Sequence, residues 1–375
     1  MINFENRLKS LKERRQGSRE RALYESMESI AANNAVLKGV DVRKSEGYEN
    51  LKEPVGVKYA IGAMAPVDSK STEVSINEGN RVADSLIKSL NSRGEDVTKR
   101  LQGSVALDIH IKGHSDVDML IVVNNPINYE IPAVSTSNYT PATDPRPLIN
   151  IIRDVRNKSE IILQENFPAA YVDCHGNKSI ALSGGSLARK VDIVPAIWFD
   201  SIKYQKSWDE NDRGIKIYHK DNHEFILNYP FNHIKKVNIR DAAYSGNLKC
   251  VVRLLKNMVA DMPEDKNKIA KKISSYDLAS IAYHMGDSLS MPSYMRLGLI
   301  EKTRLHLSCL LQSRAYRDLF LVPDESRKIF DNDDKVAALE ILTNECTDLA
   351  KEIFKELRPY SSNYDSSVLI NKSVM

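Results

Sequence analysis

The chain has 375 residues, of which 42% are hydrophobic, so it can bury a large core and is long enough for two domains. A formal net charge of +3 is too small for a protein whose main task is to hold duplex nucleic acid. No apolar run reaches the ~18 residues of a membrane span, and the charged N-terminus lacks a secretory signal, so we predict a cytoplasmic protein without a membrane partner. The four cysteines are widely spaced, which argues against a zinc knuckle and favours reduced thiols.

The first part of the chain is predicted to be charged and partly irregular. Its basic side chains alternate with glutamates in a way that is typical of a solvated helix face, as at Arg7, Lys9, Lys12, Arg14, Arg15, Arg19 and Arg21. Apolar residues at helical spacing predict an amphipathic helix over residues 18–37. The glycines and prolines that follow predict an irregular crossing up to Ser75, and a second helix is expected from Asn77 to Gly94.

The segment from residue 101 to residue 123 contains the main candidate residues for metal and phosphate binding. Asp116 and Asp118 open an apolar run that is predicted to be a buried strand, and because strand side chains alternate, both carboxylates should point the same way. Neighbouring carboxylates repel each other unless a cation lies between them, so this face is expected to hold a hard divalent metal ion. Upstream, Gly103 and Ser104 are predicted to form a turn whose backbone N–H groups can approach a phosphate.

A third acidic residue lies in a similar setting further along the chain. Residues 124–146 are rich in Pro, Ser, Thr and Asn and are predicted to be a long surface loop that could act as a lid. A helix is expected over 148–165, with strands over 170–173, 179–182, 189–197, 215–218 and 225–227. Asp192 interrupts the third of these strands, and the preceding Gly184-Gly185 pair is typical of a hairpin turn.

From Pro230 onward the apolar spacing becomes that of helices. We predict helices over 247–259, 278–285, 294–319 and 334–357, the second of them preceded by a capping box that begins at Ser274. Residues 358–375 are polar and rich in Ser. The predicted domains are a catalytic domain with an N-terminal helix over 1–228, a helical domain over 229–357 and a flexible tail over 358–375.

The order of Gly103-Ser104, Asp116-x-Asp118 and the distant Asp192 resembles the nucleotidyltransferase superfamily typified by DNA polymerase beta. The resemblance implies an α/β (α+β) fold, with a polymerase beta-like palm built on a mixed sheet and a C-terminal helical bundle. It also implies two Mg²⁺ or Mn²⁺ ions, both bridged by Asp116 and Asp118, while Asp192 chiefly holds the ion on the nucleophile side. Gly103 and Ser104 would bind the triphosphate.

The helical part is similar to the second domain of cyclic GMP-AMP synthase-like and oligoadenylate synthetase-like enzymes, through residues 251–256 and the Ser274-Ser275-Tyr276 segment. In that family a lysine on the first helix contacts the triphosphate, a serine at the start of the second helix lies at the phosphates, and the adjacent tyrosine stacks on a base. Lys256, Ser275 and Tyr276 fall on these positions. A core helix with a surface lysine and an ordinary N-cap would give the same pattern.

This resemblance predicts a template-independent, metal-dependent nucleotidyltransferase that makes a cyclic or short linear oligonucleotide second messenger from nucleoside triphosphates, in anti-phage defence. Gly-Ser is followed here by residues 105–109, without the basic residue, glycine and threonine of many bacterial relatives, so the branch and the product stay open. One alternative is a linear polymerase, including one that makes DNA or starts on Tyr360 or Tyr364. Others are nucleotidylation of a protein, a tRNA or a small molecule, and a scaffold without turnover.

The predicted partners follow from the same resemblance. They are nucleoside triphosphates and a downstream effector that senses the product. A nucleic-acid activator has no support in the sequence, and homo-oligomers stay open. Base choice, sugar choice and linkage depend on the shape of the pocket and are not predicted.

Overall fold

The computed structural model describes residues 2–15, 45–113, 115–135, 138–142 and 144–374. It divides into two units, which we call the helical unit and the sheet unit. The helical unit comprises Met1–Val67, Ile109–Gly113 and Val237–Met375, and the sheet unit comprises Asp68–Asp108 and His114–Lys236. The amphipathic helix predicted over 18–37 lies outside the described residues. No helix in the described part of the chain combines the length and the hydropathy that a bilayer crossing requires.

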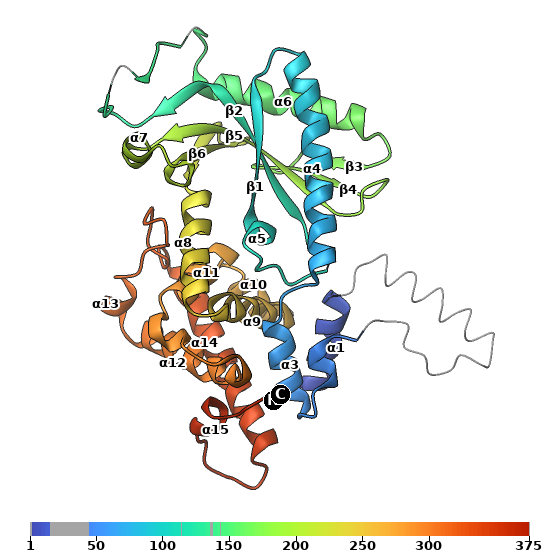
Figure 1. Ribbon diagram of the computed structural model, residues 1–375, viewed down its shortest axis with the longest axis vertical. Coiled ribbons are helices and arrows are strands. Elements are labelled where there is room, and N and C mark those ends of the chain that lie inside the picture. The colour runs from blue at the N-terminus through green and yellow to red at the C-terminus, as the bar shows by residue number, and fades with distance from the viewer. Residues whose placement is uncertain (1, 16–44, 114, 136–137, 143, 375) are drawn as a thin grey trace, which may run out of the picture. The chain divides into compact units, whose positions relative to one another are not determined.

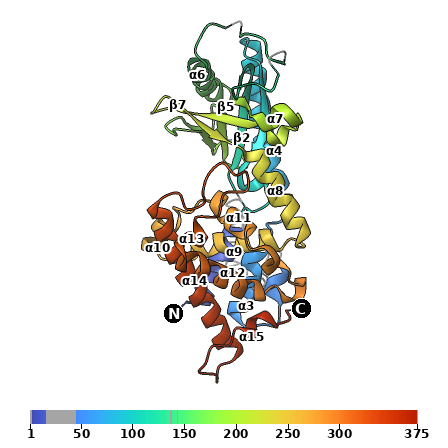
Figure 2. The same cartoon turned by 90° about the vertical axis from the view of Figure 1, so that its left-hand side faces the viewer.

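Within the described residues, seven strands form one mixed sheet. The two central strands, β2 and β5, are parallel, whereas every other pairing is antiparallel. One edge of β2 pairs with β1, and one edge of β5 pairs with β4 near its start and with β6 further along (Figure 1). Figure 2 shows the same sheet turned by 90°. The strands are β1 (Val97–Gln102), β2 (Val117–Tyr129), β3 (Tyr171–Asp173), β4 (Ile180–Ser183), β5 (Val191–Asp200), β6 (Gly214–His219) and β7 (Glu224–Asn228).

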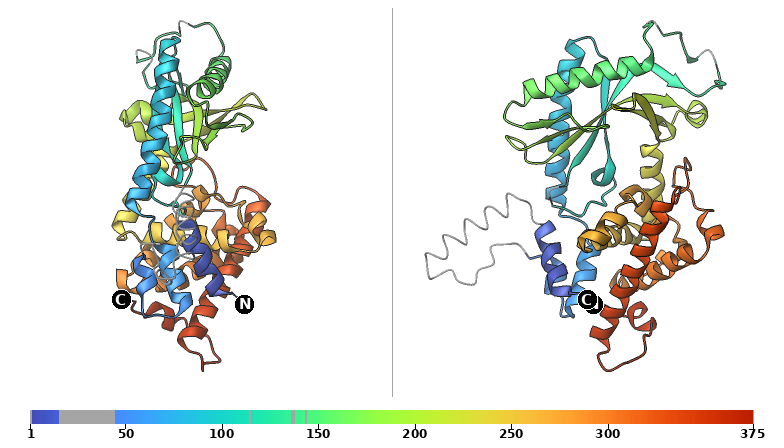
Figure 3. Two further views of the ribbon diagram at one scale, coloured as in Figure 1. Left: turned by 90° about the vertical axis from the view of Figure 1, so that its right-hand side faces the viewer. Right: turned by 180° about the vertical axis from the view of Figure 1, so that it is seen from behind.

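The two faces of the sheet have different surroundings. Helices α4 (Ser69–Ser92) and α6 (Leu148–Asn166) cover one face, as Figures 1 and 3 show, and pack on β2 through Met119 and Ile121. On the opposite face Leu120 and Val194 belong to a smaller apolar cluster. Alternation along β2 and β5 therefore sends odd-numbered residues of β2 to the helices and leaves its even-numbered residues on the other face. The mixed α/β architecture predicted from the sequence is confirmed.

The helical unit is built mainly from the C-terminal third of the chain. Helix α9 is central to its core: it carries Leu248, Val251, Leu255 and Met258, all fully buried, and packs against α3 and α11. The helices are α1 (Phe4–Arg15), α3 (Val55–Met64), α8 (Pro230–Ala243, which begins in the sheet unit), α9 (Asn247–Asp261), α10 (Glu264–Ala270), α11 (Ser275–Tyr283), α12 (Gly298–Gln312), α13 (Arg314–Arg317), α14 (Asp333–Leu357) and α15 (Ser367–Ile370). Short helices α5 (Gly103–Ala106) and α7 (Ile202–Ser207) belong to the sheet unit.

Three arginines at the start of the chain do not lie on the solvated face that the charge pattern predicts, whereas Lys9 is exposed and Arg19 and Arg21 lie outside the described residues. The side chain of Arg7 is only 9% exposed and forms an ion pair with Glu345 of α14, while that of Arg15 is 4% exposed and pairs with Glu46. Arg14 pairs with Asp261 of α9. These arginines therefore fasten α1 inside the helical unit, whereas the catalytic domain predicted over 1–228 included this stretch.

The stretch predicted to be irregular before Ser75 contains helix α3 and the first turns of α4. Two of its glycines, Gly56 and Gly62, allow neighbouring side chains to pack closely and do not end the helix. A β-carbon on Gly56 would lie 2.5 Å from Glu356 Oε2, and one on Gly62 would lie 2.6 Å from the ring of Tyr48. The predicted loop after residue 123 is also shorter than expected, because β2 continues to Tyr129.

The C-terminal residues expected to form a flexible tail are packed. Leu369 of α15 is fully buried, and the Tyr364 hydroxyl donates a hydrogen bond of 2.6 Å to Glu301 of α12. Burial, and then the bond to Glu301, raises the pKa of Tyr364, which makes its hydroxyl a poorer nucleophile. The hydroxyl of Tyr364 is thus engaged with Glu301, whereas the side chain of Tyr360 is fully exposed.

Replacing Leu369 by Ala should destabilise the helical unit, because the change leaves a cavity where α15 packs. We expect a loss of about 2–5 kcal/mol in the free energy of unfolding, measured by urea denaturation with far-UV circular dichroism. The control is Tyr360→Ala, which should change this free energy by less than about 0.5 kcal/mol. Equal effects of the two changes would show that the C-terminal residues are not packed.

Candidate functional site

The parallel pair β2 and β5 places two of the predicted acidic residues side by side. Asp118 of β2 is in register with Asp192 of β5, and on the other edge of β2 it is in register with Gln102 of β1. Both acids lie on the face opposite α4 and α6, because their neighbours Met119 and Ile193 belong to the core under those helices. Asp116 directly precedes β2 and is exposed.

Gly103 lies against one of these carboxylates. A β-carbon on Gly103 would be 2.1 Å from Asp118 Oδ2, and the residue has a φ of +78°. Only glycine satisfies both conditions without strain or a clash. Ser104 follows in the first turn of α5 and is half-buried. The structure thus brings Gly103, Asp118 and Asp192 together, with Asp116 and Ser104 adjacent to them in the chain.

A cationic residue that the sequence analysis did not single out also reaches this face. Lys190 Nζ lies 3.0 Å from Asp116 Oδ2 and 3.4 Å from Asp192 Oδ1. The preceding residues are tied to α4, because Ala188 N–H donates to Glu78 and the Arg189 guanidinium donates to Ser75. The sequence could have predicted this position of Lys190, because residues two apart along a strand lie on the same face and Lys190 is two residues before Asp192.

The electrostatics of this face fit a divalent cation. Burial raises the pKa of Asp192, and the lysine only partly offsets this effect. Asp192 Oδ1 is buried, and its contact with Lys190 is an ion pair whose geometry does not meet that of a hydrogen bond. Carboxylate oxygens in this state are ligands that Mg²⁺ and Mn²⁺ prefer. In the described parts of the chain, however, no three His, Cys, Asp or Glu side chains already converge as a metal site, so the carboxylates would have to turn towards an ion.

The other three predicted site residues belong to the helical unit. Lys256 lies on α9 and is half-buried. Ser275 is the first residue of α11, and the capping residue is Ser274, whose hydroxyl accepts from the N–H of Asp277 while that carboxylate accepts from the N–H of Ser274. The capping box predicted at Ser274 is confirmed. Ser275 is thus placed at the helix N-terminus, where its own N–H has no partner within the helix.

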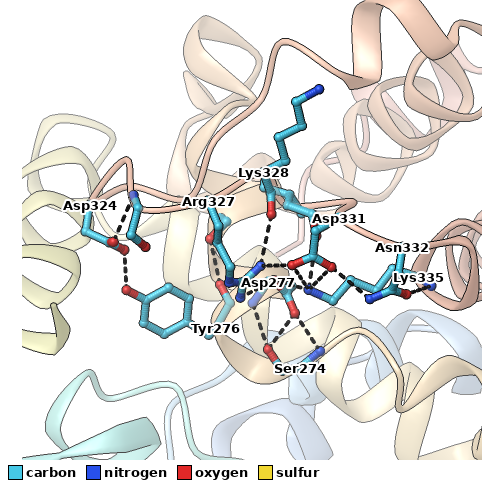
Figure 4. A network of polar contacts seen from close by, with 12 residues as sticks. Ser274, Tyr276, Asp277, Asp324, Arg327, Lys328, Asp331, Asn332 and Lys335 are labelled. Atoms are coloured by element: carbon cyan, nitrogen blue, oxygen red, sulfur yellow. Dashed lines mark hydrogen bonds and ion pairs between the residues drawn. The ribbon is translucent and has the colours of Figure 1, made fainter. Parts of the chain in front are cut away.

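Tyr276 is held by the segment that connects α13 to α14 (Figure 4). Its hydroxyl donates a hydrogen bond to Asp324, and the Arg327 guanidinium lies 5.8 Å from the centre of its ring. Burial, and then Asp324, raises the pKa of Tyr276 far above its usual value, so the phenol stays protonated. Arg327 also forms a 2.7 Å ion pair with Asp277, which is buried and is further paired with Lys335. The ring is therefore fixed in orientation at the start of α11.

Comparison with known families identifies the C-terminal part of the chain. Residues 235–351 match the cGAS/DncV-like nucleotidyltransferase C-terminal helical domain. This range begins in α8 and ends in α14. It contains Lys256, Ser275 and Tyr276, the residues for which the sequence analysis proposed nucleotide contacts.

Relatives also cover nearly the whole chain. The cyclic dinucleotide synthase CdnE of Yersinia aleksiciae is 34% identical over 363 residues, which are 94% of this chain and 93% of that protein. The structure of a STING-associated CdnE c-di-GMP synthase from Capnocytophaga granulosa is similar with a TM-score of 0.68 at 25% identity, covering 94% of this chain and 99% of that one. One from Flavobacteriaceae sp. has the same coverage and a TM-score of 0.74 at 23% identity, which shows a shared fold.

Replacing Gly103 by Ala should remove metal binding with only a modest loss of stability. The new methyl group forces the Asp118 carboxylate to turn away, and the positive φ adds a strain of about 1 kcal/mol. Mn²⁺ binding is measured by titration calorimetry, and stability by urea denaturation. Gly94→Ala is a matched control, because Gly94 has a φ of +85° but open space around its α-carbon. If both variants bind Mn²⁺ like the wild type, Gly103 does not protect the position of Asp118.

Proposed function

The chain belongs to the family of bacterial cGAS/DncV-like nucleotidyltransferases that includes the CdnE synthases, and from this premise we propose that it condenses two nucleoside triphosphates into a cyclic dinucleotide. Its class as a nucleotidyltransferase acting on nucleoside triphosphates follows from the family. The observation that carries the proposal is the in-register pair of Asp118 and Asp192 on one open face of the sheet. A cyclic product agrees with the names of its relatives, a cyclic dinucleotide synthase and c-di-GMP synthases.

Asp116, Asp118 and Asp192 would hold the metal ions on which this family generally depends, and we propose two. When bound, such ions supply positive charge that acidifies the attacking hydroxyl and stabilises the triphosphate. The chain's own contribution is to hold the carboxylates on rigid strands. Lys190 would move from Asp116 and Asp192 to the phosphates when an ion takes its place, because an ammonium group next to bound metal ions would be repelled.

We propose that residues of the sheet unit and residues of the helical unit contact the phosphates and the base of the nucleotide. Gly103 and Ser104 would approach the triphosphate through the backbone of α5, and Lys256 would add a positive charge. Ser275 would present the N-terminal N–H groups of α11 to phosphate oxygens. Tyr276 would stack on a base, which suits any nucleobase because the contact uses only the π-face.

The product would act as a second messenger for a downstream effector, in anti-phage defence. This part of the proposal is supported by two solved relatives that are described as STING-associated. A cyclic dinucleotide has no free terminal phosphate, so phosphatases would leave it intact while an effector binds it.

Loss of a single carboxylate charge should abolish synthesis. We expect Asp118→Asn and Asp192→Asn to reduce product by at least about a hundredfold, because each change removes a charge while keeping the shape of the side chain. The measurement is mass spectrometry of products after incubation with all four ribonucleoside triphosphates and Mg²⁺ or Mn²⁺. Asp84→Asn is the control, since Asp84 is an exposed residue of α4 that pairs with Lys99. A linear ladder from the wild type would contradict a cyclic product.

The role of Tyr276 can be tested by separating its ring from its hydroxyl. Tyr276→Ala should raise KM by roughly 5- to 150-fold, equivalent to the 1–3 kcal/mol of base stacking. Tyr276→Phe keeps the ring and loses the bond to Asp324, so its KM should stay near that of the wild type. Initial rates at varied nucleotide concentration give both values. Should Phe and Ala raise KM equally, the bond to Asp324 rather than stacking would be the essential feature.

A further inference from the structure

The link between the two halves of the catalytic motif leaves the sheet unit. After Gly103, Ser104 and the rest of α5, the chain runs through residues Ile109–Gly113, which belong to the helical unit, before it returns to Asp116. We call Ile109–Gly113 the link segment. Its apolar residues Ile109 and Ile111 are buried, as is His110. Asp116 follows the end of the link segment by three residues in the chain.

The link segment is bound to the last turn of α1. The N–H of Gly113 donates a hydrogen bond of 3.1 Å to the carbonyl oxygen of Arg14. Carbonyl groups in the last turn of a helix have no partner within the helix, so this one is available to a neighbouring segment. The C-terminal end of α1 thus provides an acceptor for the backbone just ahead of Asp116.

The side chain of the same residue fastens this end of α1 to α9. The Arg14 guanidinium donates two parallel hydrogen bonds of 2.7 and 2.9 Å to Asp261, and a third of 3.2 Å to Asn257 Oδ1. Bidentate pairs of this kind are both strong and geometrically specific. Asp261, whose side chain is 2% exposed, also accepts a 2.8 Å hydrogen bond from the hydroxyl of Tyr59 in α3.

We propose that Arg14 is a positioning residue for nucleotidyl transfer. Its guanidinium locks the end of α1 to Asp261, its carbonyl oxygen holds Gly113, and Gly113 in turn fixes the approach of the chain to Asp116. The inference rests on the proposed function, since it assigns Asp116 to the metal site. Arg14 itself touches none of the reacting groups.

The experiment compares two ion pairs on the same helix. Arg14→Ala and Asp261→Asn break the pair at the end of α1, while Arg7→Ala and Glu345→Gln break the buried pair nearer its start. Two quantities are measured for each variant. The first is hydrogen exchange of the peptide containing Gly113 in the unliganded protein, and the second is kcat and KM for nucleoside triphosphates, with melting temperature as the measure of stability.

We expect the Arg14 and Asp261 variants to exchange faster at Gly113 and to lose roughly 10- to 100-fold in kcat with little change in KM, because misplacement of a reacting group slows the chemical step. Arg14→Lys, which keeps one ion pair, should recover much of the loss. The Arg7 and Glu345 variants should lower the melting temperature without either effect. If Arg14→Ala does not fold, Tyr59→Phe removes one bond to Asp261 and should show the same changes in smaller degree.

Two results would overturn the inference. The first is that Arg14→Ala and Asp261→Asn show the same hydrogen exchange at Gly113 and the same kcat as the wild type. The second is that Arg7→Ala loses as much kcat as Arg14→Ala does. Failure of the proposed function is distinguishable, because it would leave the wild type without product. Hydrogen exchange at Gly113 does not depend on the reaction, so it would still decide whether Arg14 holds the link segment.

Discussion

Two carboxylates held opposite each other on buried strands repel, and the sheet unit is organised to hold that unfavourable pair in place. The apolar residues of β2 and β5 fix the register that sets Asp118 beside Asp192, and α4 and α6 bury the other face of the same strands. Lys190 supplies an opposing charge beside Asp116 and Asp192. The repulsion that folding tolerates here is the physical basis for the divalent-cation site that we propose at this face.

The parts of the site that follow a local rule could be predicted from the sequence. Strand alternation predicts Asp116 and Asp118 on one side, and Lys190 contacts both Asp116 and Asp192. The capping box at Ser274 follows from its spacing to Asp277. Strand alternation and the capping box each depend on residues only a few positions apart, so contacts with distant parts of the chain do not change either prediction. By the same alternation Lys190 lies on the face of Asp192. A lysine close to an acidic residue in sequence usually forms an exposed ion pair, so the sequence alone does not mark Lys190 as a site residue.

Features that depend on distant partners could not be predicted in this way. Gly56 and Gly62 resemble chain breakers until Glu356 and Tyr48 are known to press against them. The arginines of α1 resemble a solvated face, yet Glu345 and Asp261, far away in the sequence, bury them. The C-terminal residues resemble a tail because one leucine, Leu369, supplies much of their packing. In each case the contacting residue is so far away in the sequence that a local sequence pattern cannot reveal the contact.

The division of the chain also orders events during its synthesis. The sheet unit is encoded by residues up to Lys236, so its strands can pair while the ribosome is still making the rest. The helical unit, in contrast, joins Met1–Val67 to residues from Val237 onward, so α3 cannot pack against α9 until the later residues have been made. A nascent chain can therefore have its acidic strands in register before the helical unit has all of its parts.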